Sequence, residues 1–342
     1  MNSFDSLVGR SPAYESLLRT AKLIAATDVT VLITGETGTG KEVLANALQK
    51  ESTRSGQSFV TLNCAALPEG IAESELFGHR KGAFSGAVTD QTGRLQAADK
   101  GTLFLDEVDS LSLVLQSKLL RFLETGECQP VGQARTQKVD VRIIAATNAN
   151  LEDKIAAGEF RQDLFFRLNV VPLEIPPLRE RDKDVVRLIE HFMDHFSQEY
   201  KRCAPVFSKT AMKRLQSYAW PGNVRELRNL CERLLVLLPG QVLEATNLPQ
   251  EILSGKRPIA SGTTNNGYML PELGVNLQEL EVDLIQQALA RTNGNQSQSA
   301  RLLGMTRDTF IYRTHKYGIS ARGVNSTQSI STIRTTARAF VL

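Results

Sequence analysis

Long apolar stretches are missing from this chain. Nowhere in its 342 residues is there an uninterrupted apolar run of the about eighteen residues that a membrane-spanning helix needs. Residues 1–5 contain neither a basic start nor an apolar segment, so no signal peptide is indicated. Cysteines are few and scattered, without Cys-x-x-Cys spacing, which excludes a disulfide framework and predicts reduced thiols. We therefore expect a cytoplasmic protein.

Acidic residues are missing from the C-terminal end, where Asp308 is the last one. The basic residues that follow it are Arg313, Lys316, Arg322, Arg334 and Arg338. A basic end indicates a polyanionic partner, although many chain ends are basic without binding anything. The length is typical of two or three domains.

A glycine-rich segment is the most informative feature that is present. It lies between an apolar run, residues 31–34, and a helix-like segment that starts near Glu42. Its members are Gly35, Glu36, Thr37, Gly38, Thr39, Gly40 and Lys41. Glycines let backbone N–H groups point at phosphate oxygens, and the lysine and the helix N-terminus add positive charge. The usual Ser/Thr after the lysine, a magnesium ligand, is replaced by Glu42. The alternative is a plain surface turn, which the flanking elements disfavour.

Apolar strand-like runs alternate with helical patterns through residues 1–177. The expected strands are 30–34, 59–63, 102–105, 142–147 and 170–175. Such alternation predicts an α/β fold, a parallel sheet with helices on both faces. We expect the strand that leads to Asp106 to lie beside the strand that leads to Lys41.

The pattern after residue 177 is helical. Residues 178–252 predict a small helical domain with helices at 184–199, 209–218 and 224–238. Residues 253–276 are polar and glycine-containing, typical of a linker. Three further helices are expected at 277–290, 296–303 and 306–317 within a domain of residues 277–320, and residues 321–342 are expected to be disordered.

Two acids, Asp106 and Glu107, follow the apolar run at 102–105. Ligands of open parallel sheets bind at the edge formed by the carboxyl ends of the strands, where these two acids are expected. Asp106 suits a Mg²⁺ ligand, and Glu107 suits the base that polarises a water for attack on a γ-phosphate. The alternative is an acidic helix N-cap, which the upstream Lys41 makes less attractive.

Other polar residues stand where a nucleotide site needs them. Asn63, Thr147 and Asn148 follow two expected strands and can either contact the γ-phosphate or cap helices. Arg161, Arg167 and Arg225 can stabilise phosphoryl-transfer charge or form surface ion pairs. His191 and His195 are four apart, but no third metal ligand accompanies them.

The end of the chain suggests a helix-turn-helix, with Ala300 and Gly304 four apart. Phe310 is expected to turn inward. The residues expected to reach the major groove or its phosphates are Thr306, Arg307, Thr309 and Arg313. The alternative is a three-helix fragment with no role in DNA binding.

Several of these motifs together resemble the AAA+ activators of sigma-54 RNA polymerase, the bacterial enhancer-binding proteins. The matching segments are residues 35–42, 75–79, 82–87, 101–107, 160–168 and 220–227. They cover residues 4 to about 250 in order, and Glu42 after the lysine is usual in this family. The C-terminal segment is similar to the factor for inversion stimulation (Fis).

The resemblance assigns roles. Residues 35–42 bind ATP phosphates; Asp106 and Glu107 form the Walker B pair; Asn63 is a switch partner of Glu107; Thr147 and Asn148 are sensor I; and Arg225 is sensor II. Arg161 and Arg167 are fingers acting in trans, which implies a ring, typically a hexamer. The loop that contacts sigma-54 consists of Gly82, Ala83, Phe84, Ser85, Gly86 and Ala87, with Ser85 where the family usually has Thr, and a second loop at 127–138 is expected beside it.

The resemblance therefore implies an ATP-hydrolysing activator that binds upstream double-stranded DNA, with dimeric DNA-binding domains, and opens the sigma-54 polymerase complex. Two alternatives are a AAA+ remodeller of another target and a non-hydrolysing DNA-binding regulator. Because the ATPase pattern begins almost at Met1, we expect no receiver domain, and control by a separate regulatory protein or by abundance.

Overall fold

The protein is described by a computed structural model over residues 3–181, 183–254, 277–292 and 294–319. The chain divides into two compact units, Met1–Ile259 and Ala260–Leu342. Among the described helices, none combines the length and the apolarity that crossing a bilayer requires.

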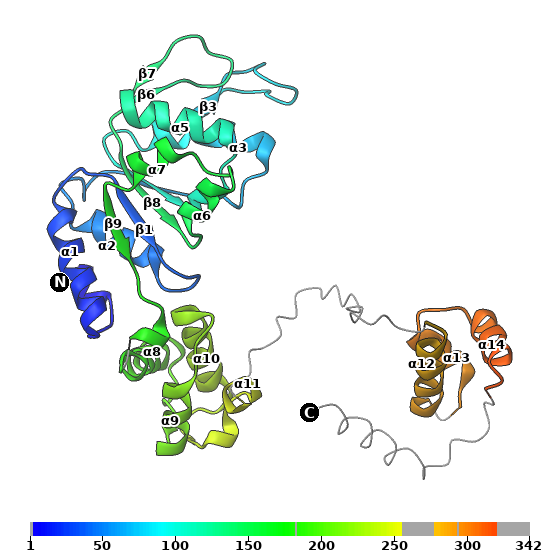
Figure 1. Ribbon diagram of the computed structural model, residues 1–342. Helices are drawn as coiled ribbons and strands as arrows, with labels where there is room; N and C mark the ends of the chain where they lie inside the picture. The colour runs from blue at the N-terminus through cyan, green and yellow to red at the C-terminus, as the bar shows by residue number, and fades with distance from the viewer. Residues whose placement is uncertain (1–2, 182, 255–276, 293, 320–342) are drawn as a thin grey trace, which may run out of the picture. The chain divides into compact units, whose positions relative to one another are not determined.

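A five-stranded parallel sheet forms the centre of the first unit (Figure 1). Its strands are β1 (Val31–Thr34), β2 (Phe59–Asn63), β5 (Thr102–Asp106), β8 (Arg142–Thr147) and β9 (Val171–Glu174). Each lies within one residue of its predicted bounds. The predicted α/β class is therefore confirmed.

The order of the strands corrects one expectation. The sheet runs β2-β5-β8-β1-β9, so β8 separates the strand that leads to Asp106 from the strand that leads to Lys41. All six residues of β8 are buried, as suits the middle strand of a parallel sheet. Because every strand is parallel, the carboxyl ends still share one edge, and Asp106, Thr147 and Thr34 come together there.

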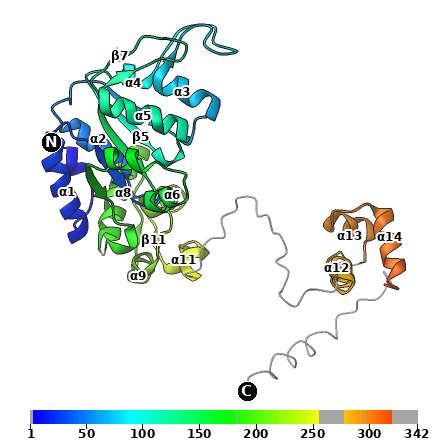
Figure 2. The same cartoon turned by 45° about the horizontal axis from the view of Figure 1, so that its top comes forward.

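Alternate residues of β8 face two separate cores. Ile144 and Ala146 pack in the cluster that includes α1 and α2, whereas Ile143 and Ala145 pack in the cluster that includes α3, α5 and α7. Figures 1 and 2 show these two groups of helices on opposite sides of the sheet. The helices are η1 (Ser3–Ser6), α1 (Pro12–Ala25), α2 (Lys41–Lys50), α3 (Glu69–Phe77), α4 (Arg94–Ala97), η2 (Val108–Ser110), α5 (Leu113–Thr125), α6 (Leu151–Ala156) and α7 (Gln162–Leu168).

Two short hairpins project from this part of the unit. One pairs β3 (Gly78–His79) with β4 (Gln91–Thr92), and the other pairs β6 (Glu127–Cys128) with β7 (Gln137–Lys138). Figures 1 and 2 show both at the end of the unit away from α9. Strands of two residues carry no readable alternation, so the sequence predicted loops here and not pairing.

A helical part completes the first unit. It contains η3 (Leu178–Glu180), α8 (Asp184–Tyr200), β10 (Val206–Phe207), α9 (Lys209–Ser217), α10 (Asn223–Leu237), β11 (Val242–Leu243), η4 (Ala245–Asn247) and α11 (Gln250–Ser254). Its core surrounds Trp220, which is fully buried and donates from Nε1 to the Leu215 carbonyl at 2.9 Å. This anchor fixes the turn into α10, and with it the position of Arg225.

The second unit contains α12 (Leu277–Arg291), α13 (Gln296–Leu302) and α14 (Arg307–Lys316). Their core consists of Ile285, Leu289, Ala300 and Phe310, so Phe310 turns inward as predicted. The predicted linker beyond Ser254 and the predicted tail lie outside the described residues.

Candidate nucleotide-hydrolysis site

The glycine-rich loop connects β1 to α2 at the carboxyl edge of the sheet. Gly40, the N-cap of α2, has φ 103°, and a Cβ there would meet nothing within 4 Å. The Lys41 ammonium lies 2.8 Å from the Gly35 carbonyl and 3.2 Å from the Glu36 carbonyl. Its position across the loop, beside the start of α2, is suited to binding phosphate.

A pocket of about 520 Å³ brings this loop together with the two acids. Lys41, Asp106 and Glu107 all line it. Burial lowers the pKa of the Lys41 ammonium, and the carboxylates of Asp106 and Glu107 oppose that effect. Glu107 has φ 53°, a backbone conformation that costs free energy in a non-glycine residue and that often marks functional sites. Cationic, carboxylate and backbone groups therefore converge as a triphosphate with Mg²⁺ requires.

The pocket is also lined by residues to which the sequence assigned no role in binding nucleotide. They come from the N-terminal segment, α1, the turn after η3 and α8, and they include Leu7, Val8, Tyr14, Arg181, Leu188, His191 and Phe192. Apolar and aromatic groups beside a phosphate cradle fit a nucleobase. No motif marks them, because they lie far apart in the sequence and meet only through folding. His191 thus lines the pocket, whereas His195 pairs with Glu199 at 3.5 Å.

A buried ion pair attaches the N-terminal segment to the helical part. Arg181 and Asp184 lie 3.2 Å apart, each with about 2% of its side chain exposed. Asp184 accepts from the Arg10 backbone N–H at 2.7 Å, and Arg181 donates to the Val8 carbonyl at 2.8 Å. Arg181 also lies over the Tyr14 ring at 3.7 Å. The wall that Val8 and Tyr14 give the pocket is therefore fixed.

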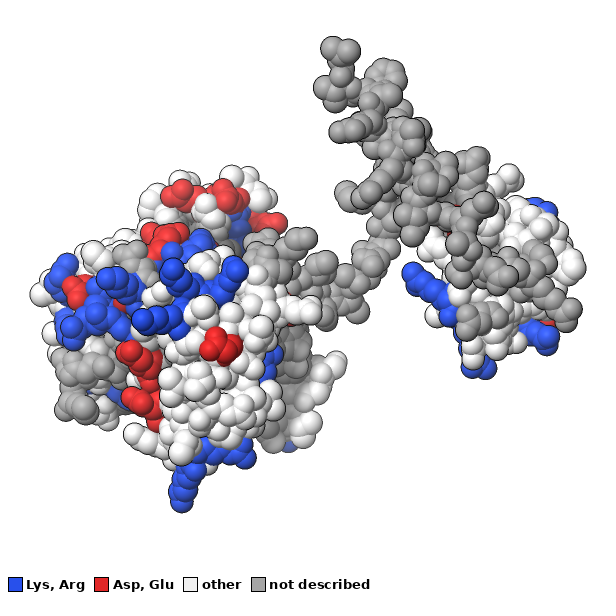
Figure 3. All heavy atoms as spheres, turned by 90° about the horizontal axis from the view of Figure 1, so that it is seen from below, with Lys and Arg blue, Asp and Glu red and all other residues white. Residues whose placement is uncertain are grey.

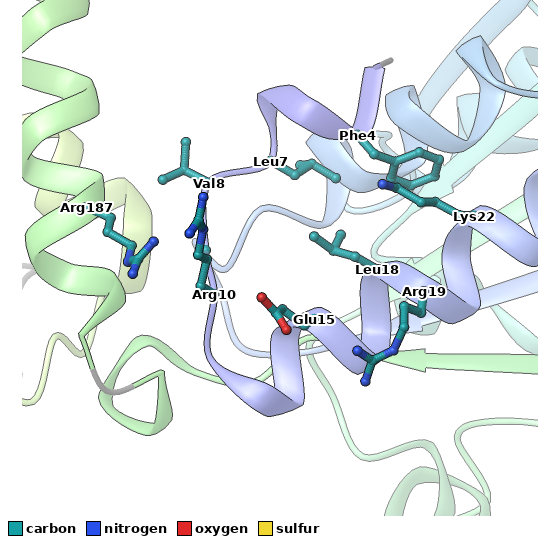
Figure 4. A pocket seen from close by; sticks show the side chains of 10 residues that line it. Phe4, Leu7, Val8, Arg10, Glu15, Leu18, Arg19, Lys22 and Arg187 are labelled. Carbon is teal, nitrogen blue, oxygen red and sulfur yellow. The ribbon is translucent and has the colours of Figure 1, made fainter. Parts of the chain in front are cut away.

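A second hollow, about 530 Å³, lies on this same unit, and Leu7 and Val8 line both. Figure 4 shows Arg10, Arg19 and Lys22 around it, with Arg187 reaching it from α8. Figure 3 shows basic side chains gathered on the face of the unit seen from below Figure 1. Among the described residues that line this hollow there is one carboxylate, Glu15, and no glycine-rich loop, so we expect phosphate binding in the first pocket.

Glu36 faces away from the phosphate cradle. Its carboxylate accepts two bonds from Arg179, at 2.9 and 2.7 Å, and one from Asn223 Nδ2 at 3.1 Å. The hydrogen bonds from Arg179, followed by the one from Asn223, lower the pKa of this carboxyl. Only the backbone of Glu36 therefore contributes to the loop, while its side chain joins the loop to the helical part.

The loop contacts the start of α10 through its backbone as well. The Arg225 N–H donates to the Gly38 carbonyl at 3.2 Å, and a Cβ on Gly38 would lie 2.3 Å from the Gly222 carbonyl oxygen. With φ 81° in addition, no other residue fits at Gly38 without moving α10. Arg225 lines the pocket, and its contact with the nucleotide stays a prediction.

The other predicted polar residues divide into two groups. Thr147 donates to Asp109 of η2 at 2.6 Å, and Asn148 donates to the Thr37 hydroxyl of the glycine-rich loop at 2.9 Å. Asn63 instead accepts from the N–H groups of Ala65 and Ala66, at 2.9 and 3.1 Å. Its side chain caps the following turn, and its pairing with Glu107 stays a prediction.

Arg161 and Arg167 do not line this pocket. Arg161 pairs with Asp163 at 2.6 Å, and Arg167 lies 3.8 Å from Glu124; both arginines are exposed at the surface. Exposed Phe166 lies between them. Within one chain they therefore stabilise no phosphate, so any role as fingers requires a neighbouring subunit.

The glycine- and alanine-rich loop follows β3. The Gly82 N–H donates to the Ala87 carbonyl at 2.8 Å, which closes the turn around Phe84. Phe84 is 42% exposed, and its ring packs edge-on against His79 at 4.9 Å. The second predicted loop lies beside it, since the Arg80 N–H donates to the Val131 carbonyl at 3.0 Å and Gly132 packs against Ala83.

In the second unit, Thr306 caps α14 by accepting from the Thr309 N–H, and Arg307 is exposed. The Arg313 guanidinium pairs with Glu281 of α12, a contact that the sequence did not predict. Exposed Tyr312, which the sequence did not single out, stands on the same helix. Contact of Thr306, Arg307, Thr309 and Arg313 with DNA stays a prediction.

Three segments of the chain match models of known protein families. Family models match the sigma-54 interaction domain over residues 7–174, the AAA+ ATPase lid domain over 179–264, and the bacterial regulatory protein, Fis family, over 276–317. The transcriptional regulatory protein ZraR of Klebsiella oxytoca is 46% identical over 305 residues, which cover 89% of this chain and 67% of the relative.

Two further proteins show the same similarity. The nitrogen fixation protein AnfA of Azotobacter vinelandii is 44% identical over 315 residues, covering 92% of this chain and 58% of the relative. The crystal structure of NtrX from Brucella abortus in complex with ADP is similar with a TM-score of 0.69 and 35% identity, covering 91% of this chain and 68% of NtrX.

Proposed function

This chain belongs to the family of sigma-54-dependent transcriptional activators, and from that premise we propose how its residues convert ATP hydrolysis into promoter opening. The protein is an AAA+ ATPase with a Fis-type helix-turn-helix. The convergence of Lys41, Asp106 and Glu107 in one pocket is the observation that supports the assignment of hydrolysis to that pocket.

In the proposed site, the backbone of the loop 35–40 and Lys41 hold the phosphates. Asp106 would hold Mg²⁺, which would neutralise negative charge on the phosphates. Glu107 orients and deprotonates the attacking water. Arg225 contacts the nucleotide from the start of α10, so that movement of the helical part follows the state of the nucleotide.

Arg161 and Arg167 complete the site from the neighbouring subunit of a ring, which we propose to be a hexamer. Their exposure, their absence from the lining of their own pocket and the exposed Phe166 between them in the sequence support this arrangement. A charge supplied in trans makes hydrolysis dependent on assembly.

We propose that Phe84 transmits the result to sigma-54. The closed turn and the packing against His79 present an aromatic side chain at the surface, and exposed aromatics act as anchors at interfaces. When the γ-phosphate is lost, a change at Asn63 and Glu107 moves this loop. The helix-turn-helix, acting as a dimer, holds the ring at upstream DNA in the bacterial cytoplasm.

Transcription in vitro tests this function. Sigma-54 polymerase on a target promoter should yield transcript only with this protein and ATP, and Glu107→Ala should remove it. Equal transcript from the wild type and the variant would refute the mechanism. ATP turnover without any effect on sigma-54 polymerase would instead favour a AAA+ remodeller of another target.

Mixing two inactive variants tests the composite site. The Glu107→Gln subunit lacks the catalytic base, and the Arg161→Ala subunit lacks the arginine finger. In rings assembled at random from equal amounts of the two, about one interface in four has both an intact base and an intact finger. Phosphate release should therefore return to about a quarter of the wild-type rate on mixing, while each variant alone stays inactive. The absence of any recovery in mixed rings of normal size would contradict fingers in trans.

A further inference from the structure

Asp109, a third acid beside the Walker B pair, is not accounted for by the mechanism above. It lies in η2, two residues after Glu107, and only 9% of its side chain is exposed. Its Oδ1 accepts from the Thr147 hydroxyl at 2.6 Å. Thr147 itself is completely buried. A short bond from a buried hydroxyl to a carboxylate is among the stronger hydrogen bonds in proteins.

This bond determines what the Thr147 hydroxyl can do. A hydroxyl has one proton to donate, and a carboxylate can only accept, so the proton points at Asp109. The oxygen of the same hydroxyl accepts from the Ala149 N–H at 3.0 Å. Thr147 is therefore oriented on both sides by protein groups, and no proton remains for a phosphate or a water.

Asn148 is oriented differently. Its side chain donates to the Thr37 hydroxyl in the glycine-rich loop at 2.9 Å and is exposed. Thr37, which accepts this hydrogen bond, lines the nucleotide pocket. Of the two neighbouring residues, one is thus fixed to η2 and the other reaches the phosphate-binding loop.

We propose that Asp109 is a positioning residue for ATP hydrolysis. By holding Thr147, it fixes the carboxyl end of β8 against the segment that carries Glu107, so that Asn148 alone senses the γ-phosphate and stays in register with the base. This inference rests on the proposed function. It assigns Thr147 a supporting role in place of direct contact with nucleotide.

The Lys154 ammonium also lies near Asp109, 3.4 Å from Oδ2, and 3.6 Å from Glu159. Its side chain is 29% exposed, and partly exposed ion pairs contribute little. The hydrogen bond to Thr147, and not the ion pair, is therefore the contact on which hydrolysis depends. The two contacts can be removed separately, by Thr147→Val and by Lys154→Met.

Steady-state ATP hydrolysis by the full chain tests the proposal. Asp109→Ala and Thr147→Val should each lower kcat by about 10- to 100-fold, as loss of a positioning contact does, with KM unchanged. The double variant should be no slower than the slower single variant, because both remove one bond. Asp109→Asn keeps an acceptor and Thr147→Ser keeps the hydroxyl, so both variants should retain kcat. Lys154→Met and the exposed control Asp194→Asn should also retain kcat.

Each result has a definite meaning. Wild-type kcat in Asp109→Ala, multiplied losses in the double variant, or a rise in KM with kcat unchanged would overturn the proposal. If Asp109→Ala does not fold, Thr147→Val removes the same bond with an isosteric side chain and decides alone. Failure of the proposed function is seen separately, as absence of turnover in the wild type.

Discussion

Replacing Glu107 by glutamine is expected to lower ATP turnover by about 10²- to 10⁴-fold, the usual contribution of a positioned general base. The amide keeps the size of the side chain but cannot take the proton of the attacking water. Lys41, Asp106 and the loop backbone, which line the same pocket, are unchanged. ATP binding should therefore persist, and phosphate release together with calorimetric titration of ATP would measure the two effects independently.

A matched control separates this effect from loss of charge. Glu190 is an exposed acid on α8 whose side chain makes no hydrogen bond or ion pair with any described residue, and Glu190→Gln should keep wild-type turnover. Turnover in Glu107→Gln within about threefold of the wild type, far short of the contribution of a general base, would show that another group activates the water.

Replacing Phe84 by alanine is expected to abolish open-complex formation on a sigma-54 promoter while ATP turnover continues. Phe84 lies on the turn after β3 and does not line the nucleotide pocket, so its removal leaves the hydrolytic groups in place. Truncating an aromatic anchor at an interface commonly costs about 2 kcal/mol or more. Phosphate release and promoter opening, measured in the same reaction, would show the separation.

Leu23 provides the control for Phe84, because it is an apolar side chain on α1 that is 78% exposed. Leu23→Ala should leave both activities unchanged. If Phe84→Ala opened the promoter as well as the wild type, the aromatic anchor would lie elsewhere. If it lost ATP turnover as well, the packing of Phe84 against His79 would be structural.

The residues whose positions could be predicted from the sequence are those that act together with their neighbours along the chain. A strand, a glycine-rich turn and a helix that begins at Lys41 follow each other along the chain, so spacing alone describes the phosphate cradle. The bounds of the strands could also be predicted, because buried strands of a parallel sheet form continuous apolar runs. Phe310 was predictable from helical periodicity.

Residues that act through contacts across the fold could not be found in this way. Tyr14 and Phe192 reach one pocket from segments almost 180 residues apart in the sequence. The strand order depends on which strands each crossover connection passes, which no local pattern gives, and the prediction that β5 and β1 are neighbours was wrong. Arg313 finds an acid on another helix, which no local pattern indicates.

The central claim is that hydrolysis of ATP, and not its binding, opens the promoter. Permanganate reactivity of thymines at the start site measures strand opening directly. With sigma-54 polymerase and the wild-type protein, we expect reactive thymines with ATP and none with a non-hydrolysable ATP analogue that binds equally well. Equal reactivity with the analogue would contradict the account.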